Sequence, residues 1–162
     1  MRIRVWRASD FARLRHLGPR LSRKTLRSRF WAGVPALPQT YLDSIATRWP
    51  HDWDAVVAIR DGQFVGWAEF GRNAPGSADA DAGFCVIDDE QGHGTGTALL
   101  AALVRHAERA GISALHADIA ADNTAAVHAW SKATGSETGS VTLGPDGYRA
   151  TIRMRRTVTH AA

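Results

Sequence analysis

The sequence predicts a single mixed α/β domain, in which helices lie between the strands of a central sheet. Apolar runs with strand-like alternation recur along the whole chain, and they are too numerous for a helix bundle. Segments with helical spacing separate them, and a glycine-rich loop joins one strand directly to a helix. The 162 residues, 44% of them hydrophobic and 22% charged, suffice for one well-packed domain and are too few for two ordinary ones.

The N-terminal part is predicted to contain one strand and three helices. The first six residues alternate as a strand does, and Ser9 and Ser22 each precede a helical pattern in the position of an N-cap residue. A break rich in glycine and proline over residues 33–38 separates the last two helices. The predicted bounds are 1–6 for the strand, and 10–17, 22–31 and 41–49 for the helices.

Hairpins and alternating strands and helices are predicted for the rest of the chain. The pair Asp61-Gly62 is typical of a tight turn between two antiparallel strands. Gly111 stands where a helix C-cap is expected. The predicted strands cover 55–60, 63–71, the segment that follows residue 78 and ends in the apolar run 84–87, 114–119, 141–143 and 148–154. The predicted helices cover 97–110 and the segment after residue 123.

The loop Gln91-Gly92-His93-Gly94-Thr95-Gly96-Thr97 follows the apolar run 84–87 and opens into a helix. Glycines let the backbone curl with its N–H groups pointing inward, and the first turn of the helix adds N–H groups without partners and the positive end of its dipole. A strand, a glycine loop and a helix in this order predict a site for a phosphate or pyrophosphate group.

The spacing of the glycines excludes two common nucleotide-binding motifs. A Rossmann fingerprint needs a glycine at the sixth position, which is Thr97 or Leu99 here, and a P-loop needs Gly-Lys-Ser/Thr. The pattern Gln-x-x-Gly-x-Gly, formed by Gln91, Gly94 and Gly96, instead resembles the coenzyme A loop of the GNAT superfamily of N-acetyltransferases. The order of elements over residues 79–139 is similar to that family as well.

This resemblance implies a fold, a co-substrate and a set of binding residues. The implied fold is a mostly antiparallel sheet of about six or seven strands flanked by helices and splayed at the strand before the loop. Its implied parts are a substrate side (1–78), an acetyl-CoA-binding core (79–139) and a C-terminal hairpin (140–157). The implied acetyl-CoA contacts are Val86, Ile87, Gln91, Gly92, His93, Gly94, Thr95, Gly96, Thr97, Asn123 and Trp130. No metal is implied, because the seven histidines and single cysteine show no metal-binding spacing.

A second segment of the chain, residues 121–132, resembles the other GNAT signature, in which an asparagine opens a helix. Asn123 is the implied contact to the pantetheine arm, and an N-cap role explains the same residue equally well. Many members of the family have a tyrosine seven residues later, which is thought to protonate the departing thiolate, and this chain has Trp130 there. An indole N–H donates hydrogen bonds but supplies no proton near neutral pH, so Trp130 is interpreted as packing or as a wall beside the thioester.

Two carboxylates are candidates for the general base that an ammonium acceptor needs. The segment 21–37 is loosely similar to bacterial protein-lysine acetyltransferase domains, in which a glutamate stands ten residues before the loop glutamine. That position is Asp81 here, one methylene shorter, and Glu69 on the neighbouring strand is the rival. The backbone N–H groups near Val86 and Ile87 are expected to stabilise the oxyanion, and Gly83 suggests a bulge or a close backbone approach.

Charge and composition limit the partners and the compartment. The formal net charge is +4, and the first 30 residues are rich in arginine, but no aromatic interleaving or nucleic-acid motif accompanies these arginines. A solvated helical face is therefore favoured over a nucleic-acid interface. No apolar run reaches membrane-spanning length, and Cys85 in an apolar strand is interpreted as a buried packing residue. A cytoplasmic protein is expected, and a homodimer stays open.

The predicted function is that of an acetyl-CoA-dependent N-acetyltransferase, an acyltransferase that acts on a primary amine of a small molecule or a protein lysine. The transfer is expected to be direct, without a covalent enzyme intermediate. The alternative is an acyl-CoA-binding sensor or interaction module with little or no catalysis. The two hypotheses differ in whether Asp81→Asn abolishes transfer while coenzyme A binding persists.

Overall fold

Seven strands form one open sheet in the order β1-β2-β3-β4-β5-β7-β6. The computed structural model describes residues 1–31 and 33–154, with the backbone alone for residues 134–138. The strands are β1 (Arg2–Val5), β2 (Trp53–Arg60), β3 (Gln63–Arg72), β4 (Asp79–Val86), β5 (Ala114–Ala120), β6 (Gly139–Gly144) and β7 (Gly147–Arg153). The helices are α1 (Asp10–Arg15), α2 (Arg23–Phe30), α3 (Gln39–Arg48), α4 (Thr95–Arg109) and α5 (Thr124–Thr138), with short 3₁₀ turns at Gly18–Arg20 and Asp88–Glu90.

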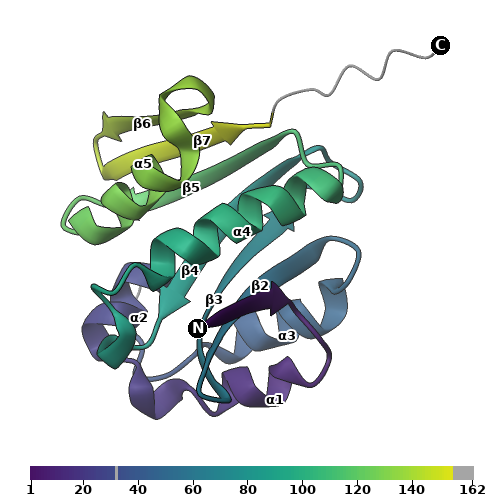
Figure 1. Ribbon diagram of the computed structural model, residues 1–162, viewed down its shortest axis with the longest axis vertical. Coiled ribbons are helices and arrows are strands. Elements are labelled where there is room, and N and C mark those ends of the chain that lie inside the picture. Colours follow the sequence, from purple (N-terminus) through teal and green to yellow (C-terminus); the bar gives the residue numbers. More distant parts are fainter. Residues whose placement is uncertain (32, 155–162) are drawn as a thin grey trace.

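The sheet is antiparallel except where β4 and β5 meet. These two strands are parallel and pair only from Asp79 to Asp81, opposite Ala114 to His116. Beyond Asp81 the two strands are no longer paired, so the sheet opens between them (Figure 1). The predicted mixed, mostly antiparallel sheet is confirmed, and so is its opening at the strand before the glycine loop.

Helices cover both faces of this sheet (Figure 1). On one face α4 crosses the central strands, and the ring of Phe84 on β4 lies against Gly96 in its first turn. On the opposite face Arg29 of α2 lies over Gly83, and Tyr41 of α3 contacts Glu69 of β3. Since side chains alternate along β4, even-numbered residues face α4 and odd-numbered ones face α2 and α3. Large buried side chains such as Trp67, Phe70, Leu99, Leu103 and Leu115 form the core between these layers.

Local sequence signals account for most element boundaries. Asp61 and Gly62 have φ of 50° and 78°, the left-handed conformation that a two-residue hairpin turn of this type requires. Ser22 caps α2 by accepting a hydrogen bond from the Thr25 N–H at 3.2 Å. The helix α4 begins at Thr95, two residues before the predicted start, because Gly94 adopts φ 79° and turns the chain directly into the helix. The C-terminal hairpin was predicted within a part ending at residue 157, and residues 155–157 lie outside the described residues.

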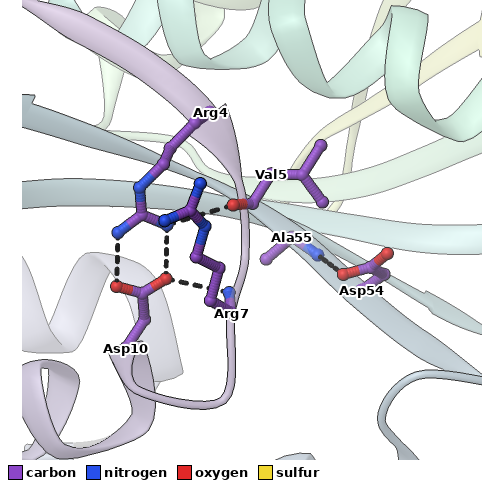
Figure 2. A network of polar contacts seen from close by, with 6 residues as sticks. All are labelled: Arg4, Val5, Arg7, Asp10, Asp54 and Ala55. Atoms are coloured by element: carbon purple, nitrogen blue, oxygen red, sulfur yellow. Dashed lines mark hydrogen bonds and ion pairs between the residues drawn. The ribbon is translucent and has the colours of Figure 1, made fainter.

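The helix α1 starts at Asp10 as predicted, but a buried ion pair replaces the expected serine cap. The Ser9 side chain makes no capping bond, and the helix ends at Arg15 instead of residue 17. The Asp10 carboxylate, fully buried, accepts two bonds from Arg4 at 2.6 and 2.7 Å and one from the Arg7 N–H at 2.9 Å (Figure 2). This pair joins β1 to α1 and thereby fixes the N-terminal edge of the sheet.

Candidate active site

The glycine loop forms the first part of the candidate site. Gly92 and Gly94 have φ of 78° and 79°, and a Cβ at either position would meet no atom within 4 Å. No side chain caps α4, and its first intrahelical bond runs from the Ala98 N–H to the Gly94 carbonyl. The preceding N–H groups of the loop and first turn therefore have no intrahelical partner, which is the condition for holding an anion at a helix N-terminus.

The predicted loop residues divide into those that face solvent and those that hold the loop in place. Gly92, His93 and Gly94 are exposed. The Gln91 side chain instead points back, donating to the Val86 carbonyl at 2.9 Å and to Thr25 Oγ1 at 3.0 Å. Gln91 thus ties α2 to the end of β4, so its place in the motif is explained by loop support as well as by ligand contact.

The first turn of α4 packs closely on the sheet. Thr95 is buried, and Thr97 is half-buried. At Gly96 a Cβ would lie 3.0 Å from the Phe84 ring, so the glycine lets α4 approach β4. This close approach brings the helix N-terminus to the strand that borders the opening of the sheet.

The register of β3 and β4 determines which backbone groups face this opening. The Ile87 N–H donates to the Val65 carbonyl at 3.0 Å, and the Asn73 N–H donates to the Asp79 carbonyl at 3.2 Å. Bonding groups alternate along an antiparallel pair, so the N–H groups of Phe84 and Val86 point away from β3. Val86 is therefore placed as the oxyanion prediction requires. The Ile87 N–H is already bonded, and Phe84 offers the second donor that the sequence did not indicate.

Asn123 and Trp130 lie on α5, beyond the opening. The Asn123 carboxamide oxygen accepts the Ala126 N–H at 3.1 Å, so the N-cap role is present in the structure. Trp130 is 1% exposed, and its indole Nε1 is a buried donor without a partner among the described residues. Trp130 thus belongs to the core and retains an unused N–H donor.

A cavity of about 690 Å³ lies on the face covered by α2 and α3. Both predicted bases line it, since Asp81 pairs with Gly71 and Glu69 pairs with Gly83 on adjacent strands. The cavity volume falls within the range of small-molecule sites. The structure therefore brings the two candidate carboxylates together on one wall of a pocket suited to an acceptor.

Glu69 is buried and engaged on every side. Arg29 and Tyr41 each donate a short hydrogen bond to its carboxylate, and Trp67 Nε1 donates to it at 3.1 Å. Although burial opposes the charge of Arg29, the neighbouring Glu69 carboxylate raises the pKa of this guanidinium. Burial and the Glu69 charge together raise the pKa of Tyr41 well above its usual value of 10.0. Glu69 is thus held as one member of a buried polar cluster, and Tyr41 stays protonated.

Asp81 has a different environment at the edge of the same cavity. It is exposed, and within the described residues no hydrogen bond or ion pair engages its carboxylate. Its charge adds to the effect of the hydrogen bond that Arg149 donates to Asp118, and both raise the pKa of Arg149. Of the two candidates, Asp81 is therefore the carboxylate that lies exposed at the cavity edge without a partner among the described residues.

Three arginines of the cavity wall were not singled out from the sequence as site residues: Arg29, Arg48 and Arg72. They lie on different elements, and no spacing along the chain connects them. Cys85, interpreted as a packing residue, is 4% exposed, and burial raises the pKa of its thiol to about 12. Within residues 1–31 and 33–154, no three His, Cys, Asp or Glu residues gather as a metal site would require.

A comparison with models of protein families identifies the family of this chain. The model of the Acetyltransferase (GNAT) family matches residues 23–135, which include α2, the cavity strands, the glycine loop and most of α5. The chain belongs to this family. This membership confirms the family that the glycine loop and the order of elements predicted.

Individual relatives agree with the family assignment. A mycothiol acetyltransferase of Brachybacterium faecium is 33% identical over 86 residues, covering 51% of this chain and 26% of that protein, so the chain matches about a quarter of the relative's length. The solved GNAT domain of S. lividans PAT superposes with a TM-score of 0.80 at 22% identity, covering 94% of this chain and 89% of that one. The structure of yncA from Salmonella typhimurium, solved with acetyl-CoA, gives 0.71 at 19% identity, covering 99% and 96%.

The residues present fit acetyl-CoA on this structure's own geometry. The open loop at Gly92 and Gly94 offers N–H groups for a pyrophosphate, and the gap between β4 and β5 offers strand N–H groups for amide and thioester carbonyls. Among the described helices, none has the length and apolar character to cross a membrane.

Proposed function

We propose that this GNAT protein transfers an acetyl group from acetyl-CoA to a primary amine, of a small molecule or a protein lysine, by direct attack within a ternary complex. The observation that carries the proposal is the position of Asp81. It lies on β4, the strand that borders the opening and leads into the glycine loop, and it also lines the 690 Å³ cavity. One strand thus serves the acyl donor at one end and the acceptor at the other.

In this proposal Asp81 is the general base, directly or through one water. An amine is protonated at neutral pH and attacks only after losing a proton, which an accessible carboxylate accepts. Glu69 is occupied by Arg29 and Tyr41, so its role is to position the cavity wall. The N–H groups of Val86 and Phe84 face the opening and would stabilise the negative charge that develops on the thioester oxygen.

No side chain is assigned as the acid for the departing thiolate. Trp130 supplies no proton near neutral pH, and Tyr41 is buried against Glu69 on the acceptor side. A thiol with a pKa near 8.5 leaves tolerably well as a thiolate, so the reaction proceeds without this acid.

The first test separates cofactor binding from a general defect of folding. In a calorimetric titration with acetyl-CoA, wild type is expected to bind saturably, and Gly94→Trp is expected to lose binding because the indole fills the open loop. Gly62→Trp is the matched control. Gly62 also has a left-handed φ, 78°, and a Cβ there would meet no atom within 4 Å, but it lies in the β2–β3 turn instead of the glycine loop. Absence of binding by folded wild type would contradict the proposal.

The second test separates catalysis from binding. Asp81→Asn is expected to lower kcat by about 10²–10⁴-fold with acetyl-CoA binding unchanged, the range that general-base catalysis contributes. If wild type binds acetyl-CoA but acetylates no amine or lysine peptide, the alternative of an acyl-CoA-binding module replaces the enzyme. Unchanged transfer by Asp81→Asn would remove the base assignment alone.

A further inference from the structure

Arg48 has a special position among the charged groups of the acceptor cavity. Six charged residues line this cavity: Arg29, Arg48, Arg72, Asp52, Glu69 and Asp81. Arg29 is neutralised by Glu69. Arg72 uses all three of its nitrogens on the main-chain carbonyls of His51, Ser77 and Ala110. Arg48 has neither a carboxylate partner nor a complete set of bonds among the described residues.

The guanidinium of Arg48 is fixed by the main chain. Its Nη2 donates to the Asp52 carbonyl at 3.1 Å and to the Arg72 carbonyl at 2.6 Å. Carbonyl oxygens orient a cation without neutralising it. Because Nε and Nη1 make no bond and are absent from the buried nitrogens that lack a partner, they remain accessible.

The fold leaves room for this cation beside the proposed base. Gly71 lies beneath Arg48, and a Cβ there would stand 3.2 Å from Nη1. Gly71 is also the cross-strand partner of Asp81. The cavity wall therefore presents an oriented, unpaired cation over one strand and an accessible carboxylate on the next.

From this juxtaposition we infer that the acceptor is a small amine that also carries a carboxylate, with Arg48 binding the carboxylate and Asp81 receiving the proton of the ammonium. The inference rests on the proposed transfer reaction and names its substrate class. A guanidinium that is already oriented forms charge-assisted hydrogen bonds with a carboxylate, and these are stronger than hydrogen bonds between neutral groups. A lysine side chain within a peptide offers no carboxylate of its own to Arg48, so it fits this wall less well.

The test compares acceptors that differ only in the anionic group. The probes are ω-amino acids from glycine to 6-aminohexanoate, each assayed beside its carboxamide, with acetyl-CoA as the donor. We expect at least one acid to be acetylated with a kcat/KM about tenfold or more above that of its amide, since hydrogen bonds between charged groups contribute a factor of this order.

Arg48→Met removes the charge and should abolish this preference by raising the KM of the acid while leaving that of the amide unchanged. Arg109→Met, at the exposed end of α4, is the matched control and should behave as wild type. The KM for acetyl-CoA and the thermal midpoint of Arg48→Met verify that the cofactor site and the fold persist. Arg48→Lys, which keeps the charge, should retain part of the preference if the Met variant unfolds.

Two outcomes would overturn the inference and leave the proposed function standing. The first is equal or faster acetylation of the amides, and the second is acetylation of lysine peptides with no acid accepted. If no amine of any kind is acetylated, and no coenzyme A is released, both the proposed function and the inference fail.

Discussion

At the scale of single residues, the two candidate bases are both carboxylates but differ in burial and in hydrogen-bond partners. Asp81 and Glu69 are diagonal neighbours on paired strands and line the same cavity. Glu69 is 5% exposed and engages Arg29, Tyr41 and Trp67, whereas Asp81 is exposed. The Glu69 carboxylate is therefore already bonded to three donors, whereas that of Asp81 is open to the cavity. The proposed division of roles rests on this difference in burial and partners.

The Arg4–Asp10 pair leads to a prediction about stability. Replacing Asp10 by Asn leaves the Arg4 guanidinium without a counter-charge in a nearly dry site, so the free energy of unfolding should fall by about 2–4 kcal/mol in chemical denaturation. Asp118→Asn is the control, because it removes an exposed aspartate–arginine pair. Asp118, with its side chain 61% exposed, accepts two hydrogen bonds from Nη1 of Arg149, whose side chain is 49% exposed. That control should cost less than about 1 kcal/mol.

The cost of Asp10→Asn should also depend on pH. Burial opposes the charge of Asp10, but the bonds from Arg4 and the Arg7 N–H outweigh it and lower the pKa below the usual 3.8. A lowered folded-state pKa gives stability that is complete above the unfolded value and is lost as the pH falls through the folded one. The difference between wild type and Asp10→Asn should therefore be constant near neutrality and shrink in acid below pH 3.8. A difference that persists unchanged in acid would contradict this account.

At the scale of elements, β4 lies between the acceptor cavity and the opening of the sheet, because its two faces and its edge contact different parts of the molecule. Phe84 faces α4, and Gly83 faces α2. The N–H groups of Phe84 and Val86 point away from β3 toward the opening beside β5. The expected bulge is not required at Gly83, because the register with β3 runs without a shift from Gly66 to Arg72. The neighbour that approaches Gly83 closely is the Arg29 side chain and not another backbone segment.

Gly83→Ala tests this packing. The new Cβ would lie 2.6 Å from the Arg29 guanidinium carbon, so Arg29 must leave Glu69. We expect the free energy of unfolding to fall by about 1–3 kcal/mol, the cost of an unpaired buried charge. Gly18→Ala, where no atom lies within 4 Å of the new carbon, should stay within about 0.5 kcal/mol of wild type.

A double-mutant cycle makes the cause specific. In an Arg29→Ala background the clash is gone, and Gly83→Ala should cost little or add stability through the better strand propensity of alanine. Equal costs in both backgrounds would show that Arg29 is not the group displaced.

At the scale of the whole molecule, the sheet consists of two parts with a narrow join. Strands β1 to β4 form one part and β5 to β7 the other, and only three residue pairs connect β4 to β5 (Figure 1). The helix α4 contacts the first part and α5 contacts the second, and the two helices pack against each other. A ligand placed in the opening would contact both parts, so its binding should stabilise the molecule as a unit.

Acetyl-CoA should therefore raise the melting temperature, with a shift that grows with the logarithm of its concentration above the dissociation constant. At 100 times the dissociation constant the linkage adds about 2.7 kcal/mol, which corresponds to roughly 5–10 °C for a chain of this size. Differential scanning fluorimetry should show this shift in wild type and Gly62→Trp, and none in Gly94→Trp. A shift of equal size in Gly94→Trp would place the ligand away from the loop.

The sequence by itself determined the elements and the acyl-donor loop, because both depend on neighbours along the chain. Turn residues, caps and periodicity predicted all seven strands and the α4 and α5 helices, and Gln91, Gly94 and Gly96 identified the family. These signals are local, since φ preferences and side-chain periodicity act within a few residues. The differences lie at element boundaries: Ser9 does not cap α1, which ends at Arg15 instead of residue 17, and α4 begins at Thr95 instead of Thr97.

Only the tertiary structure decided how the acceptor side is arranged. Nothing in the chain order relates Arg29 to Glu69, or Arg48 to the carbonyl of Arg72. The register of β3 and β4 brings the Val65 carbonyl to the Ile87 N–H and turns the Phe84 N–H away from β3. This register depends on pairing between two separate strands. Burial, charge pairing and hydrogen-bond direction are properties of contacts across the fold. They leave the Asp81 carboxylate exposed at the edge of the cavity and hold the Arg48 guanidinium on two main-chain carbonyls.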